Sequence, residues 1–266
     1  MPFRAAYLWL LLLVPMIGVA FWPGYFGHAG TVPFALHAHG LSAIGWLLLV
    51  ELQAWSAATR RLKLHRTTGL AMFGLVPAFV AGGLLAMQGM AALAAARSDP
   101  FHAHYGVRLA LDDALAIVAF LTLVTLATAQ RRRVWVHGAA MIGTVLLVLP
   151  PIVTRLPVFP DSFSFNMVFL SAEGTSLLLA LILALLYRRS RVPFGFVALT
   201  IVVQSAAVEA LGTTAGWQSI CFRLIGVPPL LLTLTGVLIG LVPLWLAWRR
   251  PLTARPAAEP ALQPGG

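Results

Sequence analysis

Six of the seven histidines in this sequence lie near the starts of four long apolar segments. They are His37, His39, His65, His102, His104 and His137. Imidazole is a ligand for haem iron and for several transition metals, so histidines paired at one depth of a membrane could hold a redox centre. If each segment crosses the membrane, successive segments run in opposite directions. The first two histidines would then share one end of a bundle with His102 and His104, and His65 would share the other end with His137.

A second group of polar residues lies within the apolar segments, where charged side chains are costly and commonly functional. Arg108 and Asp112 are four positions apart, which places them on one face of a helix. Glu173 is predicted near the middle of a later segment and Glu209 toward the end of the next one. These four residues could line a polar pocket that opens outward and binds a small substrate. Alternatively, Arg108 pairs with a carboxylate and simply locks the bundle.

The elements that must position these residues are membrane-spanning helices. The chain has 266 residues, of which 60% are hydrophobic and 10% charged, against about 25% charged in a soluble domain. A helix rises about 1.5 Å per residue, so about 20 apolar residues cross a hydrocarbon core of about 30 Å. We therefore predict an all-α transmembrane bundle of about eight spans, forming one unit over residues 1–250 with a histidine-bearing four-helix core at about 34–153. The predicted spans are 5–22, 34–55, 68–90, 105–129, 134–153, 163–187, 193–211 and 225–248.

The basic residues give this bundle an orientation, because short loops rich in Lys and Arg stay in the cytoplasm. Clusters at 60–66, 131–133, 188–191 and 249–250 all fall on the same side once eight spans are counted. We therefore expect both termini in the cytoplasm and a multi-pass protein of a bacterial inner membrane. The clusters also account for the net charge of +10 through contact with the lipid bilayer, so nucleic acid is not an expected partner.

The two ends of the chain carry further expectations. The first segment is preceded by Arg4 and contains a possible cleavage site at residues 18–20, so it is either a retained signal anchor, which we favour, or a cleaved signal peptide. Residues 251–266 are rich in Pro and Ala and are predicted to form a disordered cytoplasmic tail.

Single residues exclude two classes of cofactor chemistry. Cys221 is the only cysteine, which excludes an intrachain disulfide and a cysteine-bound iron–sulfur cluster. Lys63 is the only lysine and lies in a predicted loop, which excludes a retinal Schiff base inside the bundle.

The order of the histidine-bearing segments resembles the ascorbate-reducible dihaem cytochromes b of membranes. The resemblance covers about residues 34–153 and implies two b-type haems that transfer electrons across or within the membrane to a redox partner. It implies His39 and His104 as one axial pair, with His37 and His102 as alternates, and His65 and His137 as the other pair. The sequence has no match for that family's substrate-binding motifs, so no ascorbate site is implied.

A second resemblance concerns uncharacterised bacterial multi-pass membrane proteins. The string Gln53…Arg60…Leu64-His65-Arg66…Gly69 is similar to their LHR-x-x-G opening. His137 and Met141 are similar to their H-x-x-x-M helix start. This resemblance implies no activity.

Two other interpretations of the same residues stay open. A divalent metal could be bound by imidazole and carboxylate ligands, and the candidates are His37, His39, His102, His104, Asp112 and Asp113. The protein would then be a metal-dependent membrane enzyme, or a proton-linked transporter acting through Asp112, Asp113 and Glu173. Under the other interpretation no cofactor binds, and the histidines only anchor helix ends at the membrane surface.

Overall fold

The computed structural model describes residues 3–97 and 99–250, and this part of the chain is helical without strands, as predicted. Residues 251–266, predicted to be a disordered tail, lie outside the described residues. The α-helices are α1 Ala6–Leu11, α2 Leu13–Phe21, α3 Phe34–Ala58, α4 Leu62–Gly69, α5 Met72–Ala96, α6 Pro100–Ala129, α7 Val134–Val153, α8 Phe165–Leu186, α9 Arg191–Leu211, α10 Ala215–Ile225 and α11 Pro229–Arg249. Two short 3₁₀ helices are η1 Phe26–Thr31 and η2 Arg188–Ser190.

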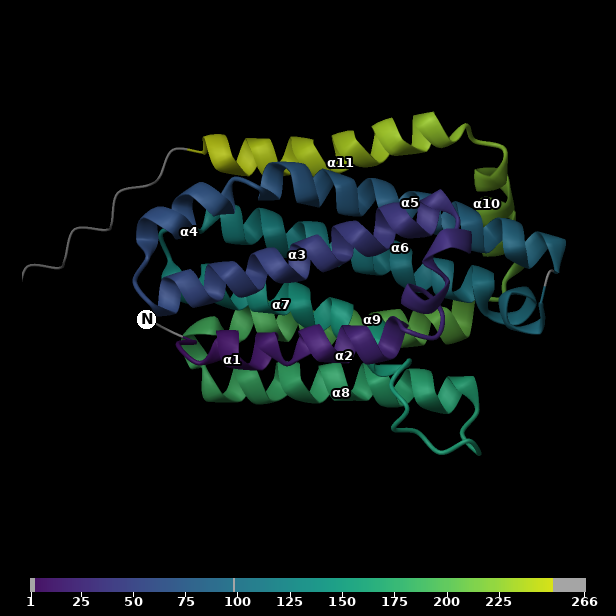
Figure 1. The fold of residues 1–266 in the computed structure, drawn as a ribbon, viewed down its shortest axis with the longest axis horizontal. Helices are drawn as coiled ribbons and strands as arrows, with labels where there is room; N and C mark the ends of the chain where they lie inside the picture. The colour runs from purple at the N-terminus through teal and green to yellow at the C-terminus, as the bar shows by residue number, and fades with distance from the viewer. Residues whose placement is uncertain (1–2, 98, 251–266) are drawn as a thin grey trace, which may run out of the picture.

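Within the described residues, seven helices are long and apolar enough to cross a membrane. They are α3, α5, α6, α7, α8, α9 with the preceding η2, and α11. The predicted first span is instead two short helices in line, α1 and α2, which lie lengthwise along the bundle in Figure 1. At about 1.5 Å per residue, Ala6–Phe21 extends about 24 Å, less than the hydrocarbon core of about 30 Å. The structure therefore supports seven of the eight predicted spans by length.

The basic clusters gather at one end of the bundle, which we call the basic end. It comprises α4, the turn between α6 and α7, η2 and the last turn of α11, all at the left of Figure 1. Arg131 joins two of these parts by donating from Nη2 to the carbonyl of Trp248 at 3.0 Å. The end that carries α10 is the opposite end. This common placement is what the positive-inside pattern predicts for one face of a membrane.

Helix α5 packs against α3, α6, α10 and α11, and glycines of α11 lie against its backbone. A Cβ atom added at Gly236 would lie 2.5 Å from Cα of Ala81, and one at Gly240 would lie 2.7 Å from Cα of Pro77. The two glycines are four positions apart, so they present one flat strip along α11. Such close approach increases dispersion contact where lipid removes any hydrophobic driving force between helices.

A buried hydrogen bond joins α3 to α7 in the main apolar core. Trp46 and Thr144 are fully buried, and Nε1 of Trp46 donates to Oγ1 of Thr144 at 3.1 Å. The same hydroxyl donates to the carbonyl of Met141 at 2.6 Å. The threonine therefore satisfies an indole N–H that would otherwise have no partner in an apolar interior.

We expect Thr144→Val to lower the free energy of unfolding by about 1–3 kcal/mol, because it leaves the indole N–H of Trp46 buried and unpaired. Reversible unfolding in mixed micelles measures this change. Thr122→Val is the matched control, since the exposed Thr122 hydroxyl bonds only to Val118 of its own helix. Equal stability of the two variants would contradict the prediction.

Helix α10 crosses the opposite end and is joined to α5 and α6 by partly buried hydrogen bonds. Gln88 of α5 donates from Nε2 to the carbonyls of Leu224 and Val227 at 2.8 and 2.7 Å. Nε1 of Trp217 donates to the carbonyl of Val107 at 2.6 Å. These bonds hold α10 against α5 and α6. Cys221 lies in the apolar contact between these helices, where it is completely buried.

Burial raises the pKa of the Cys221 thiol from 9.0 to about 11, so at pH 8 the folded protein holds about 100-fold less thiolate than a free cysteine. We expect negligible labelling by a maleimide in the folded protein and complete labelling after denaturation. Mass spectrometry at pH 8 measures both. Rapid labelling of the folded chain would show that α10 is not docked as described.

Candidate functional site

The structure brings two of the predicted ligands together at the basic end. His65 lies on α4 and His137 in the first turn of α7, and their ring centroids are 6.3 Å apart with the planes at 74°. The two histidines are 72 positions apart in the sequence and reach the same depth because α4 and the start of α7 both lie at this end of the bundle. This juxtaposition agrees with the predicted pairing.

Each ring is held by a hydrogen bond to a backbone carbonyl. Nδ1 of His65 bonds to the carbonyl of Gln53 at 3.2 Å, and Nδ1 of His137 bonds to the carbonyl of Ala127 at 2.9 Å. A carbonyl can only accept, so both Nδ1 atoms carry a proton, and in the neutral form of each imidazole the lone pair lies on Nε2. Ala127 lies in the last turn of α6, where carbonyls lack helical partners and are available to a side chain.

This donor set fits an ion held between the two rings. A metal–nitrogen bond of about 2 Å on each side, with a ring radius of roughly 1 Å, separates two imidazole centres by about 6 Å. The observed separation is 6.3 Å. Ligating histidines also typically donate their second N–H to a carbonyl, which fixes the tautomer and the ring direction. None of the described residues forms a hydrogen bond with Nε2 of either ring.

Other residues of the LHR-x-x-G segment build the surroundings of His65. Gln53 contributes its carbonyl to His65, and its side-chain Nε2 donates to the hydroxyl of Thr68 at 2.7 Å. A Cβ atom at Gly69 would lie 3.3 Å from Oε1 of Gln53, so a side chain there would press on this amide. The residues Gln53, His65 and Gly69 are thus explained as one packed unit around a histidine.

The remaining histidines have other surroundings. Both ring nitrogens of His37 are occupied, Nδ1 by the hydroxyl of Tyr25 at 2.7 Å and Nε2 by the carbonyl of Ala29 at 3.1 Å. His102 bonds through Nδ1 to the Asp99 carboxylate at 2.6 Å, and that carboxylate also caps α6. His104 is exposed. Local contacts therefore use both ring nitrogens of His37 and Nδ1 of His102.

The structure places His39 and His104 at different depths. The backbone of His39 packs on Gly82 of α5, whereas Gly106, two positions after His104, packs on Met90. Gly82 and Met90 are separated by about 12 Å along α5 at 1.5 Å per residue. The reason is the length of α6, whose 30 residues extend its start beyond the neighbouring helices. The structure therefore does not bring this predicted axial pair together.

His39 instead meets a carboxylate in the interior. Its ring stacks on Phe79, with centroids 5.4 Å apart. Its Nδ1 is buried without a hydrogen-bond partner. A cavity of about 30 Å³ lies between His39 and Asp113 of α6, which is enough for a water molecule. His39 and Asp113 also interact electrostatically.

The other predicted polar residues form two connected contacts between α6, α8 and α9. Asp112 accepts a hydrogen bond from Nε2 of Gln204 at 3.1 Å and lies close enough to Glu173 for electrostatic interaction. One helical turn toward the opposite end, Arg108 forms an ion pair with Glu209 at 2.6 Å. Of the alternatives left open by the sequence, the structure thus shows Arg108 paired with a carboxylate on another helix. Gln204 was not among the predicted site residues, because an uncharged amide within an apolar segment gives no strong signal.

Arg155, directly after α7, provides a cation near Asp113. Burial lowers the pKa of its guanidinium, and Asp113 raises it. Its Nη1 donates to the carbonyl of Pro151 at 2.7 Å. Asp113 thus has a basic side chain, that of Arg155, near it on the side of the opposite end.

The predicted metal ligands do not assemble into a metal site. In residues 3–97 and 99–250, no group of three or more His, Cys, Asp or Glu side chains is arranged to hold a metal ion. The six candidates are divided between the surface near the start of α6, the contact of His37 with Tyr25, and the interior, where His39, Asp112 and Asp113 lie. The alternative with a multidentate divalent metal consequently gains no support from this arrangement.

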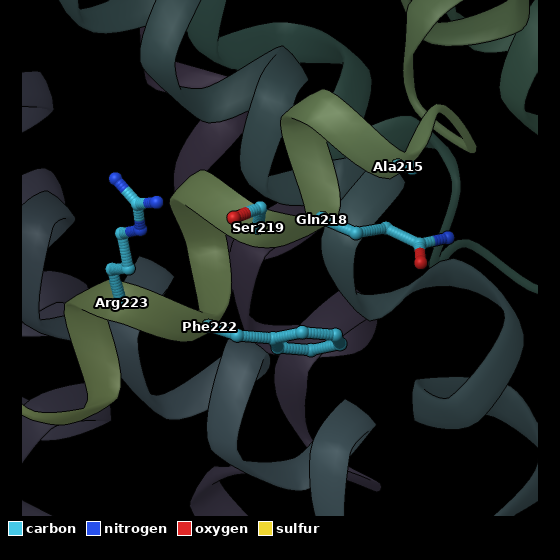
Figure 2. A pocket seen from close by; sticks show the side chains of 5 residues that line it. All are labelled: Ala215, Gln218, Ser219, Phe222 and Arg223. Atoms are coloured by element: carbon cyan, nitrogen blue, oxygen red, sulfur yellow. The ribbon is translucent and has the colours of Figure 1, made fainter.

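A surface hollow on α10 lies away from all of these residues. Figure 2 shows its lining side chains on α10, where Gln218 and Arg223 extend in different directions from the helix. The lining residues are Ala215, Gln218, Ser219, Phe222 and Arg223. A shallow surface formed by one helix does not enclose a ligand, so we do not regard it as the functional site.

No family model, curated protein or solved structure matches this sequence.

Proposed function

We propose that this protein is a membrane haem protein that binds one b-type haem between His65 and His137 at the basic end. The observation that carries the proposal is the spacing of the two rings, 6.3 Å between centroids, with both Nδ1 atoms bonded to carbonyls. In their neutral form, the two imidazoles would be suitable ligands for the iron of such a haem through Nε2. The bound haem would supply one-electron transfer.

The residues of this chain have distinct parts in the proposed site. Gln53 and Ala127 keep the two Nε2 lone pairs directed away from their carbonyls, so the imidazoles are ready to bind without a change of tautomer. Haem carries two anionic propionates, and several arginines lie near the two histidines in sequence, namely Arg60, Arg61, Arg66 and Arg131–Arg133. These arginines make the basic end the more favourable end for an anionic cofactor.

The location of this site within a cell follows from the same charges. By the positive-inside pattern, the basic end faces the cytoplasm of a bacterial inner membrane. The haem would then lie near the cytoplasmic surface, where a soluble redox partner or a membrane quinone can approach it. The proposal contains one haem, because His39 and His104 lie at different depths.

Haem titration tests this function. Detergent-purified protein made without haem supply should bind added haem with a stoichiometry of one per chain, with a Soret band that shifts and sharpens on reduction by dithionite. A control titration with the His65→Ala, His137→Ala double variant should give only the spectrum of haem in detergent. Identical spectra for the two proteins would refute the proposal.

A further inference from the structure

We propose that the cavity between His39 and Asp113 is a binding site for a single water molecule, which bridges the two side chains and so links α3 to α6. This inference is independent of haem binding and concerns a different part of the molecule. Its starting observation is that two ionisable side chains from different helices line one small cavity. Neither side chain forms a hydrogen bond with another described residue, and Nδ1 of His39 is buried.

Two glycines of α5 bring α3 and α6 together at this cavity. A Cβ atom added at Gly82 would lie 2.7 Å from Cα of His39. A Cβ atom added at Gly83 would lie 2.8 Å from Cδ1 of Ile117 on α6 and 3.8 Å from Nδ1 of His39. Ile117 lies one helical turn after Asp113 and lines the same cavity. The close packing at the two glycines therefore sets the imidazole and the carboxylate around one gap.

The rest of the cavity wall consists of apolar side chains. The ring of His39 stacks on Phe79, with centroids 5.4 Å apart. Phe79 packs in turn on Phe120 of α6, with centroids 4.6 Å apart, and Leu147 contributes from α7. These side chains cannot form hydrogen bonds. A molecule in the cavity must therefore find its side-chain partners in His39 and Asp113.

The size and the polar atoms of the cavity suit water. A cavity of about 10–15 Å³ can hold one water molecule, which then needs two to four polar partners. The volume here is about 30 Å³, and a ring nitrogen of His39 with the carboxylate oxygens of Asp113 can provide these partners. An empty cavity would leave both side chains without a hydrogen bond, which is costly in an apolar interior.

A metal cation fits this cavity less well than water does. Ca²⁺ and Mg²⁺ take about six or more ligands, most of them oxygen atoms. Within residues 3–97 and 99–250, no group of three or more His, Cys, Asp or Glu side chains is arranged to hold such an ion. The water molecule donates one O–H to the carboxylate of Asp113 and forms its second hydrogen bond with the imidazole of His39.

A crystal structure of the full-length protein, at a resolution that shows ordered water, tests the proposal. We expect one density peak in the cavity, within hydrogen-bond distance of a ring nitrogen of His39 and a carboxylate oxygen of Asp113. Ala116→Val adds two methyl groups at the cavity wall and should remove the peak. It should also lower the unfolding midpoint relative to Ala103→Val, the control on the exposed side of the same helix.

Three results would overturn the proposal. The first is a wild-type map that shows other buried waters but no peak in this cavity. The second is a direct hydrogen bond between His39 and Asp113 that closes the gap. The third is an anomalous peak in the cavity after crystals are soaked in Rb⁺ or Mn²⁺, which would identify a cation site.

Discussion

His137→Ala is expected to abolish haem binding while leaving the bundle folded. The substitution removes one of the two imidazoles whose centroids lie 6.3 Å apart, and no other histidine among the described residues stacks on or faces His65. Loss of even an outer-shell partner of a ligating group typically costs 10–100-fold in affinity, so we expect haem occupancy to fall by more than about tenfold. Soret absorbance per protein after purification measures the occupancy.

Two further variants sharpen this expectation. His104→Ala removes a predicted ligand that is exposed at the opposite end, so it should leave the spectrum unchanged. His137→Met keeps a group that can bind haem iron and should retain haem with a higher reduction potential. Full haem occupancy in His137→Ala, or loss of haem in His104→Ala alone, would contradict the assignment of the ligands.

Gly236→Val is expected to be the most destabilising substitution at the contact of α11 with α5. Its Cβ would lie 2.5 Å from Cα of Ala81, and this backbone atom cannot move aside as the end of a flexible side chain can. Relief requires separating the two helices, with loss of the contacts around Gly240 as well. Overpacking of this kind costs about 3 kcal/mol.

The matched control for this prediction is Gly74→Val on α5, where an added Cβ meets nothing within 4 Å. Valine replaces glycine within a helix in both variants, so helix propensity contributes similarly. The difference in unfolding midpoint between the two variants measures the close approach alone. Equal midpoints would indicate that α11 is not seated against α5.

The transmembrane class and the basic end could be predicted from the sequence because they depend on residue types counted over whole segments. Long apolar segments require helices in lipid, and the basic loops fall at one end by alternation alone. The pairing of His65 with His137 was predictable for the same reason. His65 lies shortly before one span and His137 at the start of another, both near the basic end, so helix order alone brings the two residues to one depth.

The position of His39 could not be predicted because it depends on where helices begin relative to each other. The sequence indicates a fourth span from residue 105, but Asp99 and Pro100 start α6 earlier, and Arg97 ends α5 in a left-handed conformation at φ 48°. These local features extend α6 beyond the membrane-spanning length and separate His104 from His39 in depth. A hydropathy profile of the sequence does not reveal this difference in depth between the two histidines.

The partners of the interior carboxylates could not be predicted from the sequence either. The sequence suggests that Arg108 pairs with an acid, but the choice of Glu209 depends on how α6 packs against α9. That packing is close because Gly212, directly after α9, lies against the Arg108 side chain. A Cβ atom added at Gly212 would lie 3.1 Å from Cγ of Arg108. Side-chain partners across helices are set by such packing and not by spacing along one helix.

Electron paramagnetic resonance of the ferric, haem-loaded protein tests the central claim most directly, because the signal reports both axial ligands and the angle between their planes. The imidazole planes of His65 and His137 lie at 74°, close to perpendicular. We therefore predict a low-spin signal of large anisotropy, as expected for two imidazoles with nearly perpendicular planes. A high-spin signal, or a protein that takes up no haem at all, would contradict a bis-histidine haem at the basic end.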